Sequence, residues 1–247
     1  MSTTHKTKGI VLRTVKYGET SIITTVYTEL FGIQSYIVKG VRQSTKKSSA
    51  KAIYFQSAAI LDMIVYHNQF KNLNFIKEYQ WSYLYKNVLS DVVKNTVALY
   101  LVEMLQHSLK QPEANTELFY IVEDTLKQLD NGTAALVANL PLYFCLHLGG
   151  KLGFRIQGSY NKSTPFLDLQ EGQFIKEKPV HPYFIDKSLA EATSTLLSVN
   201  FYNDLENIHF SRSTRQSLIL AYQNYIALHV NDFGEIKSLS VLQSVFS

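Results

Sequence analysis

The spacing of apolar residues changes near residue 80, and this change constrains the fold more than any other feature. Before it, short runs rich in Ile, Val, Thr and Tyr alternate with turn residues, a pattern typical of strands. After Ser82, apolar residues recur every three or four positions, as they do in amphipathic helices. We therefore expect an α+β chain with two domains, residues 1–80 and 81–247.

The first domain is expected to contain five antiparallel strands. Strands of this length and spacing indicate a small barrel or sandwich. One option is a five-stranded barrel of the oligonucleotide/oligosaccharide-binding (OB) type, whose exposed strand face and loops commonly bind single strands. The expected strands are residues 8–15, 20–28, 33–39, 53–66 and 73–79.

The second domain is expected to be helical. Its central helix, residues 133–152, is nearly all apolar, and Pro141 should kink or split it. Residues 154–186 have no helical period and form an irregular insertion with one short hairpin at 166–175. The other expected helices are residues 83–109, 117–129, 187–199, 212–229 and a short tail within 231–246.

Positive charge is concentrated in the first third of the chain. Residues 1–80 hold eleven Lys or Arg and four Asp or Glu, a net charge of +7, whereas the whole chain is only +4. Within it, the loop 38–51 carries five cations and no acid. Such a loop fits a polyanion, because each neutralised phosphate releases condensed counterions. A solvated surface loop without a ligand is the competing interpretation.

If the partner is DNA, cations of the first domain should contact phosphates, and exposed tyrosines could stack on bases. Core packing is the alternative role for either tyrosine. The expected DNA-binding residues are Arg13, Lys16, Tyr17, Tyr36, Lys39, Arg42, Lys46, Lys47 and Lys51.

Catalytic and metal-binding patterns are weak. Cys145 is the only cysteine, so neither an intramolecular disulfide nor a thiolate metal cluster can form. The seven histidines include no metal-binding spacing, and no glycine-rich loop precedes a helix in the way that phosphate binding requires. We expect no catalytic residues, no metal and no cofactor. A polar start and the lack of about 20 consecutive apolar residues predict a cytoplasmic protein with no membrane partner.

Several short segments, taken in order, resemble the RecO family of bacterial recombination mediators. Together they extend over most of the chain, and the likeness is strongest near the N-terminus. The segments are Gly-Glu-Thr-Ser-Ile at 18–22, Thr-Glu-Leu-Phe-Gly at 28–32, Val-Lys-Gly-Val-Arg at 38–42, Tyr-Phe-Gln at 54–56, Ile-Lys-Glu at 76–78, the stretch 148–154 and Ile-Lys-Ser-Leu at 236–239.

The resemblance implies an OB-type barrel followed by a helical domain, in a nucleoid-associated cytoplasmic protein of DNA repair. It implies binding to single- and double-stranded DNA, strand annealing, and work with RecR to load RecA onto strands coated by single-strand-binding protein. Many members carry a four-cysteine zinc ribbon after the segment that matches 152–154. Residues 155–187 contain no cysteine, so we predict a hairpin without zinc.

The resemblance also implies a docking site for the C-terminal tail of single-strand-binding protein. That tail is acidic and ends in an apolar residue, so it needs an apolar pocket with cations on its rim. No Lys or Arg lies between Lys127 and Lys151, so other segments must supply the cations. Solvated or paired arginines are the alternative. The candidates are Leu148, Lys151, Leu152, Phe154, Arg155, Arg212, Arg215 and Leu218.

Two other classes of function compete with a DNA-binding mediator. A protein-interaction scaffold would carry the same basic loop as a solvated surface. An enzyme acting on nucleic acid is disfavoured, because the sequence lacks the acidic metal cluster that two-metal nucleases need.

Overall fold

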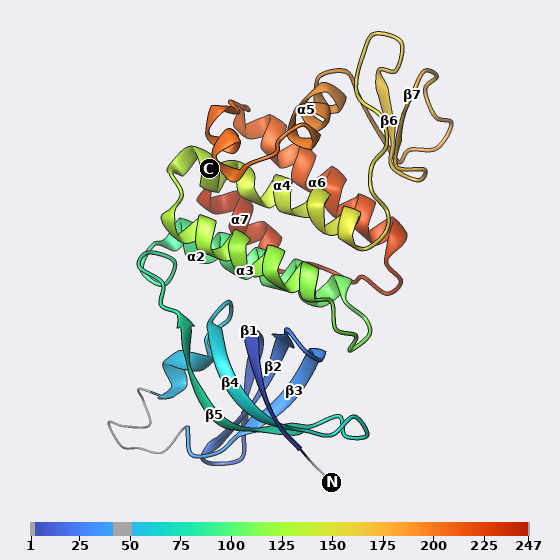
Figure 1. The fold of residues 1–247 in the computed structure, drawn as a ribbon. Helices are drawn as coiled ribbons and strands as arrows, with labels where there is room; N and C mark the ends of the chain where they lie inside the picture. The colour runs from blue at the N-terminus through green and yellow to red at the C-terminus, as the bar shows by residue number, and fades with distance from the viewer. Residues whose placement is uncertain (1–2, 42–50, 247) are drawn as a thin grey trace. The chain divides into compact units, whose positions relative to one another are not determined.

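The computed structural model describes residues 3–41 and 51–246 and divides into two compact units (Figure 1). The first unit contains Met1–Lys86 and Leu109–Lys127, and the second contains Asn87–Ser108 and Gln128–Ser247. Leu109–Lys127 therefore belongs with the strands, although it follows them in the helical part of the sequence. The expected domain limits, 1–80 and 81–247, stay a proposal.

The first unit is a closed five-stranded barrel, as predicted. The strands follow the order β1-β2-β3-β5-β4, and every neighbouring pair is antiparallel except β3 and β5. This is the OB-type arrangement expected from the sequence. The strands are β1 (Thr3–Tyr17), β2 (Ser21–Thr28), β3 (Gly32–Val38), β4 (Ile60–His67) and β5 (Asn74–Tyr83).

Alternating side chains build the barrel core. In β2, Ile22, Thr24 and Val26 are buried, while the residues between them are only partly covered. Burying one face of each strand is what made the period of two visible in the sequence. The core includes Val11, Ile22, Val26, Tyr36, Val38, Val41, Phe55, Leu61, Met63 and Val65.

Two strands start several residues away from the expected positions. β1 starts at Thr3, five residues early, because its polar first half pairs with β4 from Thr3–His67 to Lys8–Asp62 and closes the barrel. Backbone pairing of this kind needs no apolar side chains. β4 starts only at Ile60, because Ala58 adopts a φ of +69° and interrupts the chain after the 3-10 turn η1 (Ile53–Phe55).

The first half of α3 (Thr116–Asn131) packs on the barrel. The Tyr27 hydroxyl donates to the Asn115 carbonyl at 3.0 Å, and the Tyr27 and Phe119 rings lie 5.6 Å apart. Gly32 has a φ of +62°, and a Cβ there would collide with the backbone of Glu113. These contacts explain why Leu109–Lys127 joins the first unit.

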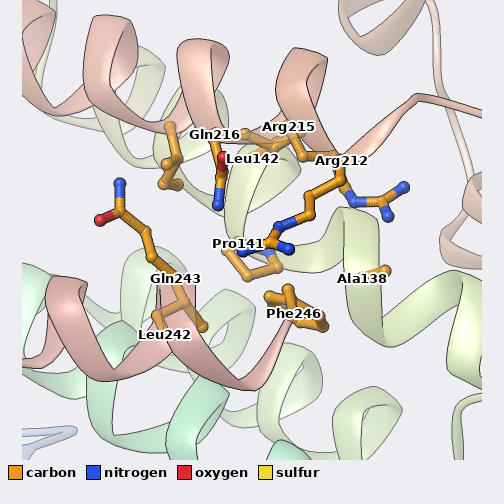
Figure 2. A pocket seen from close by; sticks show the side chains of 10 residues that line it. Ala138, Pro141, Leu142, Arg212, Arg215, Gln216, Leu242, Gln243 and Phe246 are labelled. Atoms are coloured by element: carbon orange, nitrogen blue, oxygen red, sulfur yellow. The ribbon is translucent and has the colours of Figure 1, made fainter.

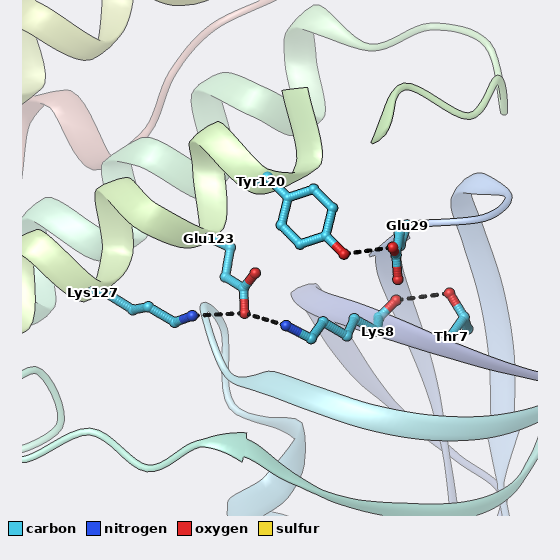
Figure 3. Close-up of polar contacts among 6 residues, drawn as sticks. All are labelled: Thr7, Lys8, Glu29, Tyr120, Glu123 and Lys127. Carbon is cyan, nitrogen blue, oxygen red and sulfur yellow. Dashed lines mark hydrogen bonds and ion pairs between the residues drawn. The ribbon is translucent and has the colours of Figure 1, made fainter. Parts of the chain in front are cut away.

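Figure 3 shows a carboxylate that ties α3 to β1. Glu123 Oε1 lies 2.9 Å from Lys8 Nζ and 2.9 Å from Lys127 Nζ. The Glu123 side chain is only 4% exposed, whereas the two lysines are about one third exposed. Beside it, the Tyr120 hydroxyl donates to Glu29 at 2.6 Å.

The second unit is built around α4, as the apolar run 133–152 predicted. α4 packs against α2, α5, η2 and α6, while α7 packs against α2 (Figure 1). None of the helices in the described chain has the length and apolar character required to cross a membrane. The helical elements are α2 (Val92–Ser108), α4 (Ala134–Lys151), α5 (Lys187–Leu197), η2 (Tyr202–Asn207), α6 (Arg212–His229) and α7 (Ser238–Val245).

α4 is one continuous helix, so the expectation that Pro141 could split it is wrong. The Thr133 hydroxyl accepts from the Leu136 amide and caps the first turn. Pro141 removes one backbone donor, but most side chains of the helix are buried against its neighbours. That tertiary packing outweighs a single missing hydrogen bond.

The helix expected from Tyr83 begins only at Val92. β5 runs on to Tyr83, and the turn that follows is fixed by Asp130, whose Oδ1 accepts from the Asn87 and Val88 amides at 2.8 and 2.9 Å. Asp91 then caps α2 by accepting from the Val93 amide at 2.8 Å. These side-chain acceptors favour a turn over helix.

The insertion forms a small three-stranded sheet in the order β7-β6-β8, which confirms the expected hairpin and adds a strand. Its strands are β6 (Phe166–Asp168), β7 (Gln173–Ile175) and β8 (Phe184–Asp186). The Asp168 carboxylate lies 3.2 Å from His181 Nε2. Within the described ranges, no three His, Cys, Asp or Glu side chains gather in a group that could hold a metal ion.

Candidate nucleic-acid interface

An open groove of about 650 Å³ runs along the barrel where β3 meets β5. Four lysines line it, Lys39, Lys51, Lys71 and Lys77, and no carboxylate is among its described lining residues. Lys77 also lies 3.5 Å from the exposed Glu78 carboxylate. Clustered cations beside a concave surface concentrate anions there.

The groove exists because β3 and β5 pair over a very short distance. Only two parallel pairs join them among the described residues, Tyr36–Asn74 and Ile37–Phe75. In β5 the register shifts: Val65 pairs with Ile76 but Ile64 pairs with Glu78, so Lys77 is the extra residue of a bulge. A bulge redirects a side chain, and here the Lys77 side chain lines the groove.

Aromatic rings share the groove with the lysines. Tyr66 and Phe75 are 36% and 39% exposed, and the partly buried Tyr79 lies beside them. Lys39 Nζ lies 5.4 Å from the centroid of the Phe75 ring. Cations that follow a backbone, together with rings on which bases stack, are the combination that binds single-stranded nucleic acid.

A second concave site lies among the helices of the second unit. α4, α6 and α7 surround a small, almost entirely apolar pocket with Arg212 and Arg215 beside it (Figure 2). Arg215 Nη1 donates to the Phe210 carbonyl at 2.6 Å, while its Nε is buried and has no partner among the described residues. Burial lowers the pKa of the Arg215 guanidinium. The pocket is lined by Ala138, Pro141, Leu142, Arg212, Arg215, Gln216, Ile219, Leu242, Gln243 and Phe246.

Two family models cover nearly the whole chain. The model described as Recombination protein O N terminal matches residues 1–85, and that described as Recombination protein O C terminal matches residues 89–239. The chain belongs to the RecO family.

Full-length relatives agree with this RecO assignment. The chain is 34% identical over 245 residues to DNA repair protein RecO of Flavobacterium psychrophilum, covering 98% of this chain and 99% of the relative. It is 30% identical over 240 residues to DNA repair protein RecO of Christiangramia forsetii, covering 97% and 98%. It is 28% identical over 243 residues to DNA repair protein RecO of Azobacteroides pseudotrichonymphae, covering 98% and 99%.

In this RecO-family chain, the cations expected to bind DNA fall into three groups. Lys39 and Lys51 line the groove. Arg13 and Lys16 are exposed near the end of β1, with Tyr17, 49% exposed, at the β1–β2 turn. Arg42, Lys46 and Lys47 lie outside the described residues.

Tyr36 cannot serve as a stacking residue in this structure, which corrects the sequence-based expectation. Its side chain is fully buried in the barrel core, where β3 pairs with Thr24 of β2. Burial raises the pKa of its phenol, and the hydroxyl has no hydrogen-bond partner in the described chain. Successive side chains of β3 lie on opposite faces of the strand, and closure of the barrel places this ring on the inner face.

Two of the four lysines of the groove, and its aromatic rings, were not identified from the sequence. Lys71 and Lys77 entered only as part of the net charge of residues 1–80, and Tyr66 and Phe75 were assigned only to strands. The sequence did contain a signal, because a lysine lies close to an aromatic residue both in the β4–β5 connection and in β5. Nothing in the linear order shows that β5 borders β3.

The residues expected to dock the tail do not form one site in this RecO-family chain. Arg212 and Arg215 border the apolar pocket, but Leu148 and Leu218 are buried. Lys151, Leu152, Phe154 and Arg155 lie at the far end of α4, about 15 Å along the helix from Pro141. There the Phe154 ring stacks on His229 with centroids 4.8 Å apart. The pocket instead uses Pro141, Leu142, Leu242 and Phe246.

Proposed function

We propose that this RecO-family chain acts in recombinational DNA repair as a mediator without catalytic activity. It binds single- and double-stranded DNA through the barrel, anneals complementary strands, and helps load RecA together with RecR. The observation that carries the proposal is the β3–β5 groove, with four lysines and exposed aromatic rings on one concave surface.

The chemistry of the groove favours a nucleic-acid strand over a small anion. Its lysines lie on separate segments around one opening, so several of them can neutralise phosphates of the same strand. Its rings offer flat apolar surfaces that every base can cover, which supports binding without sequence preference. A scaffold with a merely solvated basic surface would not need exposed rings beside the lysines.

The residues of the groove also favour binding over hydrolysis. Two-metal phosphodiester cleavage needs carboxylates that hold both ions close to the scissile phosphate. The described residues that line the groove include no Asp or Glu. We therefore assign it no catalytic step.

Salt-dependent binding tests the proposal directly. With four to six phosphate contacts to a single strand, the logarithm of the binding constant should fall with the logarithm of salt at a slope of about −3 to −4. The variant Lys39→Ala, Lys51→Ala, Lys71→Ala, Lys77→Ala should flatten the slope by about 3. Lys162→Ala with Lys176→Ala, two exposed lysines of the second unit, is the control. Binding that ignores salt contradicts the proposal.

Annealing is tested with complementary labelled oligonucleotides, free or coated with single-strand-binding protein. The parent chain should accelerate annealing of both, and the four-lysine variant should lose most of that acceleration. A duplex ligand measured in parallel compares the two forms of DNA. If the four-lysine variant anneals the strands as fast as the parent, annealing does not depend on the groove.

A second role is supported by the helical pocket. The small apolar pocket lies beside Arg215, whose buried Nε lacks a partner in the described chain, so its chemistry matches a peptide end that carries an apolar side chain and a carboxylate. We assign it to the acidic C-terminal tail of single-strand-binding protein.

Charge reversal distinguishes this placement from the other end of α4. Arg212→Glu with Arg215→Glu should weaken binding of an acidic tail peptide and leave oligonucleotide binding nearly intact. Lys151→Glu with Arg155→Glu changes the net charge by the same amount at the opposite end of the helix and should bind the peptide like the parent. Equal peptide affinity for the parent and the Arg212/Arg215 variant would overturn the placement.

A further inference from the structure

Phe70 lies at the tip of the β4–β5 connection with 87% of its side chain exposed. The connection joins two strands of the barrel, and residues on both sides of its tip, Asn68 and Lys71, line the lysine groove. A ring this exposed contributes little to the stability of the fold. It is therefore available to contact a ligand that enters the groove.

Hydrogen bonds hold the tip in one conformation. The buried side chain of Asn74, the first residue of β5, accepts from the Asn68 amide at 3.0 Å and donates to the Lys71 carbonyl at 3.4 Å. Asn68 in turn accepts from the Phe70 amide at 2.9 Å through its side chain and from the Lys71 amide at 3.0 Å through its carbonyl. The turn thus presents the ring outward.

The tip stands between two hollows of the barrel. On one side is the lysine groove, and on the other is a hollow of about 410 Å³ lined by Phe31, His67, Gln69 and Asn72 among others. Lys71 lines both hollows. A nucleic-acid strand whose phosphates contact the groove lysines would reach the Phe70 ring at the edge of the groove.

We infer that Phe70 stacks on a nucleobase of the strand bound in the groove and so separates that base from its neighbour. The inference rests on the proposed function of the groove. Apolar side chains that insert between bases are an established way to unstack a strand. The adjacent Lys71 ammonium favours nucleic acid over an apolar protein surface, because a protein pocket for Phe70 would have to bury that charge next to the ring.

Affinity for normal and abasic strands tests the inference. The ligands are a labelled single-stranded oligonucleotide and a strand of the same length in which abasic sugars replace the nucleosides. Phe70→Ala should weaken binding of the normal strand by about 5- to 150-fold, the range expected for one base–aromatic stack. It should leave binding of the abasic strand and the salt slope unchanged, because no charge is removed.

Two further variants complete the test. Phe201→Ala removes a ring that is 72% exposed in the second unit and should bind both strands like the parent. Phe70→Trp should keep the affinity of the parent, because an indole also stacks on a base. After subtraction of the parent signal, the emission of the new indole should be quenched by the normal strand and not by the abasic strand.

The outcomes separate this inference from the proposed function. If the parent binds no oligonucleotide even at low salt, both are overturned. If the parent binds with the expected salt slope and Phe70→Ala binds equally well, the groove stands and the role of Phe70 is overturned. If Phe70→Ala weakens the abasic strand as much as the normal strand, the ring acts through the fold and not through a base, which also overturns the inference.

Discussion

Lys8 and Glu123 are 115 residues apart in the chain, yet the Lys8 ammonium donates to the Glu123 carboxylate at 2.9 Å. The same oxygen accepts from Lys127 at 2.9 Å, so one buried carboxylate neutralises two lysines (Figure 3). This contact joins β1 to α3 and holds Leu109–Lys127 in the first unit. It is the clearest polar link between the strands and a helix that follows them much later in the sequence.

Replacing Glu123 by Gln should destabilise the first unit. The amide cannot carry the charge that both lysines require, and hydrogen bonds to charged groups contribute about 1.5–3 kcal/mol each when partly buried. We expect a loss of about 1–3 kcal/mol in the free energy of unfolding, measured by urea denaturation. Asp124→Asn, a change of the same kind at an exposed position of the same helix, should cost much less.

The same carboxylate should make the free energy of unfolding depend on pH. Burial by itself raises the pKa of Glu123, but the hydrogen bonds and charges of Lys127 and Lys8 outweigh it, so its pKa lies below the ordinary value of 4.5. The stabilisation is therefore fully present above about pH 5.5 and is lost as the pH falls through the folded-state pKa, below 4.5. Urea midpoints measured from pH 3 to 7 should converge for the parent and Glu123→Gln at the acidic end. Parallel curves would contradict this assignment.

Trp81, the only tryptophan, should report on ligands in the groove. Its ring stacks on Tyr54 with centroids 4.8 Å apart, and Tyr54 contacts the edge of Tyr79, which lines the groove. Oligonucleotide titration should change the Trp81 emission with the same midpoint as fluorescence anisotropy of a labelled strand. Trp81→Phe should abolish the emission change while keeping most of the affinity.

Tyr36→Phe should leave DNA binding unchanged and should not destabilise the barrel. The change removes a buried hydroxyl that has no hydrogen-bond partner among the described residues, so the unfolding free energy should stay equal or rise by up to about 1 kcal/mol. Tyr36→Ala, which leaves a cavity in the core, should cost about 3–5 kcal/mol. Weaker oligonucleotide binding by Tyr36→Phe at unchanged stability would reinstate Tyr36 as a contact residue.

The sequence by itself determined the class of fold and the positive net charge of the first third of the chain. Because a strand buries alternate residues and a helix buries every third or fourth, the change of period near residue 80 separated barrel from helices without any knowledge of their packing. The apolar run of α4 likewise marked the central helix. Net charge located the cations in the first third of the chain, since charge depends on composition and not on conformation.

Only the tertiary structure decided which of these residues meet. The parallel pairing of β3 with β5 brings Lys39 beside Phe75, and a bulge directs Lys77 into the same groove, although neither relation appears in the local pattern. The same alternation that identified β3 left open which face would be inside, and the barrel buried Tyr36. The helical pocket assembles from α4, α6 and α7, whose contributing residues are up to about a hundred positions apart. Local propensity sets the elements, whereas long-range burial and pairing select which side chains share a surface.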